Sequence, residues 1–377
     1  MESRTDIVLV GPVYPYKSGI AHYTGLLCGE LRRHYRVTMI SYSMQYPKLL
    51  FRKEQRDYEN DTFKAEDTEY LINTASPPSI LRAADRINSL SPSLVIIQWW
   101  HPYFAPCYSI LTGRLKSRVL FTCHNVFPHE RFPFDRLLTK HTLKKGDYFI
   151  LHSQKDAGDL LSIIGDAKYA VTVHPTYSAF RKEARKDPDS LAGQETEGDA
   201  PGLLFFGFVR PYKGLRVLIE ALTQLPEAVR LGIVGDFGGK REEYEALIRE
   251  KDLTGRIHIH DGYVPDSEVG AYFERCDAVV LPYLEATQSG IAQIAFGFEK
   301  PVIATRAGGL PEVVKDGETG VLCEPGDPEA LSAAIRRFYE LRDTVDFAGN
   351  IREDAKRFSW EAMAEAISGL TGLPYTR

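Results

Sequence analysis

Residues 278–305 read Ala-Val-Val-Leu-Pro-Tyr-Leu-Glu-Ala-Thr-Gln-Ser-Gly-Ile-Ala-Gln-Ile-Ala-Phe-Gly-Phe-Glu-Lys-Pro-Val-Ile-Ala-Thr. The apolar run 278–281 predicts a buried strand, and a helix-forming segment follows from Ser289. A second strand is expected at 301–304. Because a strand, a helix and a strand in this order form the repeating unit of a parallel sheet covered by helices, this stretch predicts an α/β fold.

The same alternation extends over the rest of the chain, and a stretch with hardly any apolar residue, 180–202, interrupts it. We therefore expect two Rossmann-like, doubly wound domains that face a cleft. They are predicted at 1–180 and 202–358, with a linker at 181–201 and a C-terminal helix at 359–377. Ligands of such domains bind at the carboxyl ends of the strands.

The expected elements are these. Strands are predicted at 7–10, 37–42, 94–98, 119–122, 148–152 and 170–173 in the first half, and at 203–206, 229–234, 257–259, 278–281, 301–304 and 321–323 in the second. Helices are predicted to start near Gly19, Leu215, Arg241, Asp266, Ser289, Pro328 and Trp360.

The composition is that of an ordinary globular protein, with 377 residues, 44% apolar and 26% charged. This length excludes a single small binding module. The apolar runs fall far short of the roughly 20 residues that cross a bilayer, and residues 1–20 lack the pattern of a secretory signal. Five scattered cysteines without a Cys-x-x-Cys pair predict reduced thiols, so we expect a cytoplasmic protein.

The formal net charge of -5 hides an asymmetry between the two halves. Residues 1–175 hold 22 Lys+Arg against 17 Asp+Glu, and residues 176–377 hold 24 against 34, so the halves carry about +5 and -10. An excess of five positive charges spread over 175 residues is too small to select nucleic acid, so no nucleic-acid partner is expected.

The loop before the helix at Ser289 suits a phosphate group. Its backbone N–H groups and small side chains lie at a helix N-terminus, where anions are stabilised. The donor-binding candidates in this loop are Thr287, Gln288, Ser289 and Gly290. Glu285 would stand at the edge of the cleft, and Gln293 lies further along the helix. The alternative is a capped strand-to-helix junction with a surface glutamate.

This region and the run Ala307-Gly-Gly-Leu-Pro-Glu-Val-Val, followed by Asp316-Gly and Thr319-Gly-Val-Leu-Cys-Glu-Pro-Gly-Asp, closely resemble the carboxyl-terminal domain of retaining GT-B glycosyltransferases of family 4. That family has a Glu-x7-Glu pattern here, with both glutamates on the sugar nucleotide. The resemblance places Glu285 against hydroxyls of the transferred sugar. Gln293 stands at the second position, where an amide would hold ribose hydroxyls less strongly than a carboxylate.

A second match lies in Phe205-Phe-Gly-Phe-Val-Arg-Pro-Tyr-Lys-Gly-Leu. The family has an arginine and a lysine here that contact the donor diphosphate. Lys213 is in place, but Phe208 stands at the arginine position, and Arg210 is the nearest substitute. Cations there would offset the charge on the leaving diphosphate. The alternative for both cations is a solvated turn. Val264 is a further donor-binding candidate of this half.

The first half carries weaker matches. Ser18-Gly19 stands where the family has a glycine-rich loop at a helix N-terminus, which suits a phosphate or sugar. The run Phe121-Thr-Cys-His-Asn-Val resembles the element whose histidine points at the donor sugar, so the resemblance implies that role for His124. Asn125 would orient that ring or the acceptor. A histidine at a strand end is otherwise more often structural.

No metal site or cofactor is expected. The histidines form no His-x3-His pair, and the Asp187-Pro-Asp189 sequence lies in the expected linker. The family generally works without a bound metal, and its terminal helix crosses back to the first domain. Two further segments have two interpretations each. The aromatic run 98–104 lines an acceptor pocket or belongs to the core, and the basic and apolar run 46–53 contacts lipid or is an exposed loop.

The resemblance implies a retaining, metal-independent glycosyltransferase with a UDP-linked or GDP-linked sugar donor. The catalytic candidates are Glu285, His124, Lys213 and Arg210. The expected acceptor is a saccharide or a lipid-linked saccharide of surface-polysaccharide biosynthesis, with peripheral contact to the inner membrane. Two alternatives stay open: an inactive sugar-nucleotide binding or scaffold protein, which Gln293 and Phe208 motivate, and a sugar-nucleotide epimerase or phosphorylase.

Overall fold

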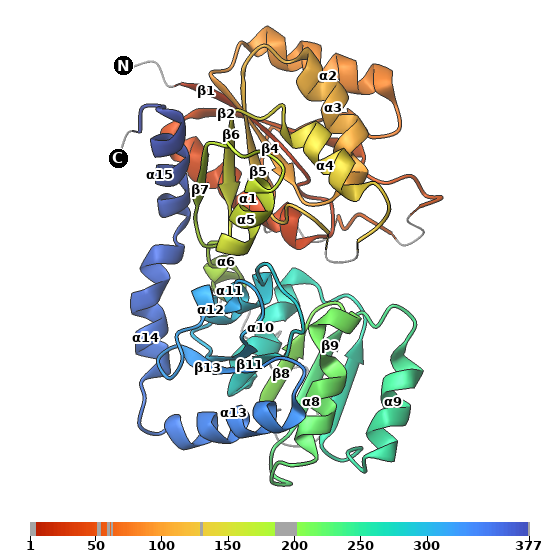
Figure 1. The fold of residues 1–377 in the computed structure, drawn as a ribbon, viewed down its shortest axis with the longest axis vertical. Coiled ribbons are helices and arrows are strands. Elements are labelled where there is room, and N and C mark those ends of the chain that lie inside the picture. Colours follow the sequence, from red (N-terminus) through yellow and green to blue (C-terminus); the bar gives the residue numbers. More distant parts are fainter. Residues whose placement is uncertain are drawn as a thin grey trace. The chain divides into compact units, whose positions relative to one another are not determined.

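A computed structural model describes residues 5–50, 54–58, 61, 63–128, 131–184 and 202–375. The chain forms two compact units, residues 1–173 with 360–377, and residues 174–359. Each unit is built on its own parallel sheet (Figure 1). The predicted fold class, two doubly wound α/β domains, is confirmed.

The first unit contains a seven-stranded sheet in the order β3-β2-β1-β4-β5-β6-β7 among the described residues. Its strands are β1 (Asp6–Val10), β2 (Arg36–Met44), β3 (Glu69–Asn73), β4 (Leu94–Trp99), β5 (Arg118–Cys123), β6 (Tyr148–Leu151) and β7 (Tyr169–Val171). Its helices are α1 (Gly19–His34), α2 (Pro77–Leu90), η1 (Pro102–Phe104), α3 (Ala105–Arg114), α4 (Asp135–Leu143), α5 (Gln154–Leu161) and α15 (Trp360–Thr371).

Alternate residues of the strands feed two separate cores in this unit. Val8 and Val10 of β1 pack with α2, α3 and α5, whereas Ile7 and Leu9 pack with α1 and α15. Successive side chains of a strand point to opposite faces, so a strand that is apolar throughout is covered on both sides. Helix α15 thereby becomes part of the first unit, with the Tyr23 hydroxyl 3.7 Å from the Met363 sulfur.

The second unit contains a six-stranded sheet in the order β10-β9-β8-β11-β12-β13 among the described residues. Its strands are β8 (Leu203–Phe206), β9 (Leu231–Gly235), β10 (Ile257–Asp261), β11 (Ala278–Leu281), β12 (Val302–Thr305) and β13 (Gly320–Cys323). Its helices are α6 (Ser178–Ala184), η2 (Pro211–Lys213), α8 (Leu215–Leu222), α9 (Arg241–Glu250), α10 (Asp266–Arg275), α11 (Gly290–Gly297), α12 (Leu310–Val313), α13 (Pro328–Leu341), α14 (Phe347–Asp354) and η3 (Ala355–Phe358).

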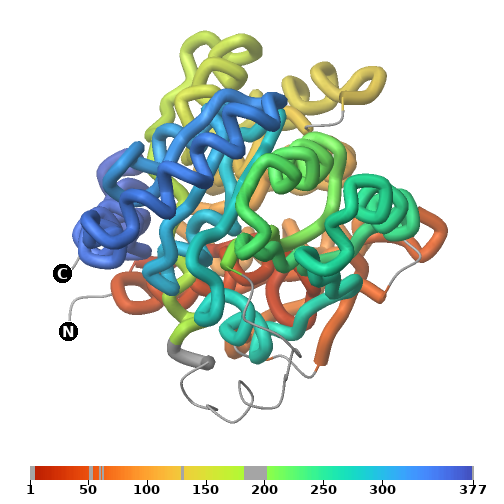
Figure 2. The backbone as a smooth tube through the Cα atoms, turned by 90° about the horizontal axis from the view of Figure 1, so that it is seen from below, coloured from red at the N-terminus to blue at the C-terminus, as the bar shows by residue number. Residues whose placement is uncertain are grey.

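Helices α8, α9 and α13 cover one face of this sheet and share its apolar core. Figure 2 shows α8 and α9, in green, side by side. Helices α10 and α11 both pack against α6. A Cβ at Gly297 of α11 would lie 2.9 Å from the carbonyl carbon of Tyr177, which shows how closely α11 approaches the start of α6.

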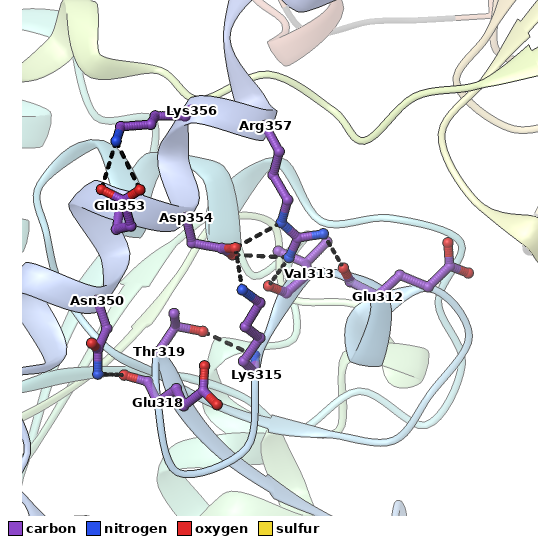
Figure 3. Close-up of polar contacts among 10 residues, drawn as sticks. All are labelled: Glu312, Val313, Lys315, Glu318, Thr319, Asn350, Glu353, Asp354, Lys356 and Arg357. Carbon is purple, nitrogen blue, oxygen red and sulfur yellow. Dashed lines mark hydrogen bonds and ion pairs between the residues drawn. The ribbon is translucent and has the colours of Figure 1, made fainter.

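Segment 347–358 is held to the second unit by a buried carboxylate (Figure 3). Asp354 accepts from Lys315 Nζ at 2.6 Å and from Arg357 at 2.9 Å. The Arg357 guanidinium also donates to the carbonyl oxygens of Glu312 and Val313 at 2.9 and 3.1 Å. Two segments that lie far apart in the sequence, 312–315 and 354–357, are therefore joined through one carboxylate and one guanidinium.

The predicted linker differs from the structure in one respect. Residues 181–184 belong to α6, which packs on α10 and α11, and the chain passes from the first unit to the second after Val173. The rest of the expected linker, 185–201, lies outside the described residues. Asp187 and Asp189 lie there as well. Sequence reasoning also missed β3, a half-exposed edge strand that pairs with β2.

Candidate active site

The order of each sheet reverses between two neighbouring strands, β1 and β4 in the first unit and β8 and β11 in the second. In open parallel sheets the loops at the carboxyl ends of such strands diverge and leave room for a ligand. In the second unit, these are the loops that carry Lys213 and Glu285. In the first, they carry Gly19 and the segment after Gln98.

Lys213 ends the short helix η2, and its amine is enclosed by protein. The side chain is 9% exposed, and burial followed by repulsion from Arg210 lowers its pKa from 10.5 to about 8. Its Nζ lies 5.7 Å from the centre of the Tyr283 ring. Among the described residues, no carboxylate lies within 4.0 Å of this amine. The solvated turn that was the alternative for Lys213 is therefore wrong.

Gly207 makes room for this amine. Its φ is +101°, and a Cβ there would lie 3.2 Å from Lys213 Nζ and 3.5 Å from Ile291 Cδ1 of α11. The absence of a side chain at this position leaves the amine and the first turn of α11 next to the same backbone. Lys213 and the N-terminus of α11 therefore both carry positive charge next to Gly207.

Glu285 lies in the loop after β11, which two backbone hydrogen bonds tie to its neighbours. Leu284 N donates to Tyr212 O at 2.7 Å, and Gly309 N donates to Thr287 O at 3.1 Å. Gly308 has a φ of +52°, and a Cβ there would lie 1.7 Å from Ala286 O, so only glycine fits. The loop therefore has a fixed backbone, from which Glu285 extends as an exposed side chain.

Helix α11 begins at this loop with a side-chain cap. Ser289 Oγ accepts from Ala292 N at 3.4 Å and lies 3.3 Å from the Tyr283 hydroxyl. Gln293, one turn further, is fully buried, and both polar atoms of its amide are without a partner among the described residues. A buried amide without a partner costs free energy, which is typical of a group that a ligand completes.

The other candidates of the second unit differ in exposure. Phe208 is 56% exposed, and Arg210 is also exposed, with Nη1 3.9 Å from the position of a Cβ at Gly238. Val264 is buried in the loop between β10 and α10. Thr287 is buried, and Gln288 is half-buried. Gly290 is the first residue of α11.

In the first unit, Ser18 and Gly19 form the start of α1 as predicted. Ser18 Oγ accepts from Ala21 N at 3.0 Å and caps the helix. Gly19 is exposed, and a Cβ there would have no described atom within 4 Å. The positive end of the helix dipole and an accessible backbone favour an anion or a polar ligand there.

His124 follows β5 and is oriented by a residue that sequence reasoning did not select. Its Nε2 lies 2.8 Å from Gln98 Oε1, and its backbone N–H donates to Trp99 O at 2.8 Å. Gln98 is fully buried, and its Nε2 is without a partner among the described residues. A Cβ at Gly11 would lie 2.6 Å from Gln98 Cγ, so this glycine makes room for the glutamine.

The sequence contained one signal for Gln98, because it is a polar residue in the otherwise apolar run 94–100. The ring of His124 also packs edge-on against Tyr23 of α1, with the ring centres 4.6 Å apart. The N-terminal part of α1 and His124 therefore lie at the same edge of the sheet. Asn125, the next residue, is half-buried.

A buried carboxylate supports the loop that follows His124. Asp156 Oδ1 accepts from Val126 N at 3.3 Å, and Oδ2 accepts from Ser153 Oγ at 2.6 Å. Burial raises the pKa of Asp156 from 3.8 to about 6, against the effect of these two hydrogen bonds. Since both its oxygens are used in anchoring the loop, we assign Asp156 a structural role.

The structure bears on the two interpretations of each of the runs 98–104 and 46–53. Trp99 and Phe104 are fully buried, so the aromatic run 98–104 belongs at least in part to the core. In the run 46–53, Leu49 and Leu50 are exposed, and residues 51–53 lie outside the described part.

All five cysteines are buried and free. Within the described ranges, no group of three His, Cys, Asp or Glu side chains could hold a metal ion, and no helix is both long and apolar enough to span a bilayer.

Two family models match the chain and together cover most of it. The model described as Glycosyl transferases group 1 matches residues 200–341, and the model described as Glycosyltransferase Family 4 matches residues 17–176. An uncharacterised glycosyltransferase of Methanocaldococcus jannaschii is 34% identical over 263 residues, which are 67% of this chain and 68% of that protein.

A D-inositol 3-phosphate glycosyltransferase of Xylanimonas cellulosilytica is 29% identical over 59% of this chain. The match spans 55% of the length of that protein. Among solved structures, sucrose-phosphate synthase from Thermosynechococcus elongatus is similar with a TM-score of 0.74 at 20% identity, over 97% of this chain and 98% of that one. The Anabaena protein HepE in complex with UDP-glucose is similar with a TM-score of 0.70 at 18% identity, over 98% of this chain and 100% of that one. These structures have the same fold.

Proposed function

Because the chain belongs to the glycosyltransferases and has their GT-B fold, we propose that it transfers a sugar from a UDP-linked or GDP-linked donor to an acceptor hydroxyl. The observation that carries this proposal is the buried amine of Lys213 beside the N-terminus of α11, with no described carboxylate to neutralise it. A buried cation of this kind is completed by an anionic ligand. The similar HepE structure contains UDP-glucose, which supports a nucleotide-sugar donor.

Lys213 would neutralise the diphosphate as the bond to the sugar breaks. The negative charge on the leaving group increases in the transition state, so a cation already in place stabilises that state more than the ground state. The first N–H groups of α11 would act in the same direction, with Thr287, Gln288, Ser289 and Gly290 around the diphosphate. Exposed Arg210 would approach the same charge from solvent.

Glu285 and Gln293 would hold the two hydroxyl-bearing parts of the donor. Glu285 is exposed and ionisable, so it would accept hydrogen bonds from hydroxyls of the transferred sugar. Gln293 offers one acceptor and two donors, and both ends of its amide are without a described partner. It would therefore pair with ribose hydroxyls that donate and accept. Val264 is assigned to the same donor.

In the first unit, His124 would contact the sugar, and Ser18 and Gly19 would bind the donor. Asn125 would orient the His124 ring or the acceptor. The proposed reaction proceeds with retention: the acceptor hydroxyl attacks the face that the diphosphate leaves, and a diphosphate oxygen takes its proton. No carboxylate nucleophile, metal or further cofactor is assigned. The proposed acceptor is a saccharide or lipid-linked saccharide of surface-polysaccharide synthesis, on the cytoplasmic side of the membrane.

The test is a transfer assay with the full chain, a panel of UDP-, GDP- and ADP-sugars, and saccharide and lipid-linked saccharide acceptors. Release of nucleoside diphosphate only when acceptor is present, and a product with the anomeric configuration of the donor, would support the proposal. A sugar nucleotide converted to its epimer without acceptor would favour the epimerase.

A specific observation keeps one alternative, a sugar-nucleotide binding or scaffold protein. The family's second glutamate is Gln293 here, and its arginine position is occupied by Phe208, which is 56% exposed. That protein class would be favoured if the chain binds a donor without turnover and neither Gln293→Glu nor Phe208→Arg restores turnover. Turnover by the unchanged chain would exclude it.

A further inference from the structure

The loop that follows β4 carries three half-buried rings, those of Trp100, His101 and Tyr103. Their neighbours Trp99 and Phe104 are fully buried. The aromatic run is therefore divided, because two of its rings belong to the core while the other three keep accessible surface at the carboxyl end of β4. We refer to Trp100, His101 and Tyr103 as the aromatic platform.

Two further side chains hold the rings of Trp100 and Tyr103 in place. The ring centres of Trp100 and Phe104 are 4.1 Å apart, and Trp100 Nε1 donates to the Tyr46 hydroxyl at 3.3 Å. The Tyr103 ring packs on the same two side chains, 4.9 Å from Tyr46 and 5.0 Å from Phe104. A ligand therefore meets rings that are already ordered, so little conformational entropy is lost on binding.

His101 presents an N–H donor that the fold does not use. Its Nδ1 accepts from Tyr103 N at 3.0 Å, and burial lowers the pKa of the ring below its usual value of 6.5. The ring is therefore neutral at pH 7 and has its proton on Nε2. Stacking on Phe132, with the ring centres 5.7 Å apart, restricts its plane. Among the residues that the structure describes, no group accepts from Nε2.

The Tyr103 hydroxyl presents a complementary acceptor. Thr74 Oγ1 donates its single hydrogen to Gln45 O at 2.8 Å and lies 3.1 Å from the Tyr103 hydroxyl. Because Thr74 has no second hydrogen, Tyr103 donates to Thr74. The lone pairs of the Tyr103 hydroxyl oxygen can then accept from the hydroxyl of a ligand. The platform thus combines aromatic faces with one donor and one acceptor, and none of these groups is charged.

Two cations are close to the platform in the sequence, but neither completes it. Arg131 precedes Phe132, pairs with Asp135 and lies 4.4 Å from the centre of the Phe127 ring. Lys48 is exposed, and in the described part of the chain no contact joins it to the platform. A phosphate group would find no cation among the platform side chains, so the platform suits an uncharged ligand.

The position of the platform indicates what this ligand is. His124 N donates to Trp99 O at 2.8 Å, and Trp99 directly precedes the platform. In the proposed function His124 contacts the transferred sugar, so the molecule that receives this sugar must reach the same edge of the sheet. A sugar ring matches the platform, because it has a face of C–H groups and a rim of hydroxyls that both donate and accept.

We propose that the aromatic platform is the acceptor subsite and that it selects an uncharged sugar ring. The C–H face of the ring packs on Trp100, one hydroxyl accepts from His101 Nε2, and another donates to the Tyr103 hydroxyl. This inference rests on the proposed function and deepens it, since it narrows the acceptor to a saccharide whose receiving sugar carries no phosphate. Trp100, His101 and Tyr103 are its specificity-determining residues.

The experiment measures binding to the full chain by saturation-transfer difference NMR. The probes are the methyl glycosides of glucose, galactose and mannose, the corresponding sugar phosphates, and N-acetyltryptophanamide as an aromatic probe without sugar hydroxyls. At least one methyl glycoside should bind, with the strongest signal from the C–H protons of one ring face. The corresponding sugar phosphate should bind about tenfold more weakly, because its charge is not compensated.

Paired variants separate the groups of the platform. Trp100→Leu should raise the Kd of the bound glycoside about tenfold, whereas Trp100→Phe keeps a ring and should stay within about threefold. Tyr103→Phe removes the acceptor, and His101→Asn keeps an acceptor for Tyr103 N but is too short to donate to the ligand. Each should raise the Kd about fivefold. Tyr148→Phe, at a half-buried tyrosine that begins β6 at the opposite edge of the sheet, is the matched control and should change nothing.

Kinetics with a working acceptor give a second measurement. Tyr103→Phe should raise the KM for the acceptor about fivefold and leave the KM for the donor unchanged, because the platform binds only the acceptor. The thermal midpoint of Tyr103→Phe should equal that of Tyr148→Phe, which separates a lost contact from a damaged fold.

The proposal is overturned if no methyl glycoside binds, or if the sugar phosphates bind as tightly as the glycosides. It is also overturned if N-acetyltryptophanamide binding depends on the platform in the same way, or if Tyr103→Phe and His101→Asn leave the Kd unchanged. Platform-dependent glycoside binding in a chain that transfers no sugar would support the platform and contradict the proposed function. Sugar transfer with an acceptor KM that the platform variants do not change would do the reverse.

Discussion

Lys213 links stability to function at the scale of one residue. Burial lowers its pKa to about 8, so below pH 8 the folded state carries the cost of an enclosed charge. Between pH 8 and 10.5 the unfolded chain binds more protons than the folded one, and the free energy of unfolding therefore rises with pH over this window.

Lys213→Met should consequently be more stable than the unchanged chain at pH 7, by about 3 kcal/mol, since each pKa unit corresponds to about 1.4 kcal/mol. The difference should shrink between pH 8 and 10. Urea unfolding at pH 7.0 and 9.5 measures it. Equal stability of the two proteins at pH 7, or a difference that grows at pH 9.5, would contradict the enclosed charge.

Glu285 is the opposite case, because its exposed side chain contributes little to the fold. If it holds the transferred sugar, Glu285→Gln should lower kcat/KM by about 100-fold or more and leave the thermal midpoint within about 1 °C. Glu324→Gln, at another exposed glutamate, is the matched control and should change neither quantity. Full activity of Glu285→Gln would remove this residue from the mechanism.

Gln98 is a positioning residue for His124. Its Oε1 faces His124 Nε2, which favours the tautomer with the proton on Nε2. In Gln98→Met this preference should disappear, and Gly11→Ala should weaken it because a Cβ there would lie 2.6 Å from Gln98 Cγ.

Nitrogen-15 chemical shifts of the His124 ring report the tautomer directly. Thr122→Val, which changes a buried polar side chain of the neighbouring strand β5, is the control and should leave these shifts unchanged. A His124 ring with its proton on Nε2 in all three variants would show that Gln98 plays no part in the choice.

At the scale of elements, Asp354 holds the C-terminal segment 347–358 to the second unit (Figure 3). Desolvation raises its pKa, but hydrogen bonds from Arg357 and Lys315 outweigh this and keep it below 3.8. Lys315 and Arg357 are 49% and 37% exposed, so water solvates them when the carboxylate is removed, and the loss of these charged hydrogen bonds costs about 2 kcal/mol.

Asp354→Ala should therefore lower the thermal midpoint by several degrees, whereas Asp343→Ala should have almost no effect, because Asp343 is 84% exposed. The stabilisation from Asp354 is present above pH 3.8 and should be lost as the pH falls below it. Calorimetry of both variants measures this difference. Equal midpoints would mean that segment 347–358 is held by its apolar contacts alone.

Elements differed in how well the sequence predicted them, and the reasons are physical. Strands such as β1 and β11 are buried on both faces, so continuous apolar runs mark them. Edge strand β3 has two partly exposed faces and was missed. The end of the expected linker, 181–184, is helical because α6 packs on α10 and α11, a tertiary effect that composition does not record.

For the whole molecule, the sequence predicted the fold class and the two strand-end regions that carry the candidate residues. The helix starts near Gly19 and Ser289 were predicted, and they are confirmed, because a helix start depends on local features such as a serine cap. The amine of Lys213 lies near Tyr283, which is far away in the chain, and Gln98 contacts His124 from a neighbouring strand. Such long-range contacts have no local pattern, so the structure was needed to find them.

The central claim is that this chain binds a nucleotide-sugar through the Lys213 site, and a thermal-shift panel tests it most directly. UDP-, GDP- and ADP-sugars and the free diphosphates would be added to the unchanged chain, to Lys213→Met and to Lys240→Met. A ligand at 100 times its Kd stabilises the native state by about 2.7 kcal/mol, which raises the midpoint by several degrees. We predict a shift for one nucleotide class that is retained in Lys240→Met and greatly reduced in Lys213→Met. No shift with any nucleotide-sugar, or an equal shift in Lys213→Met, would contradict the claim.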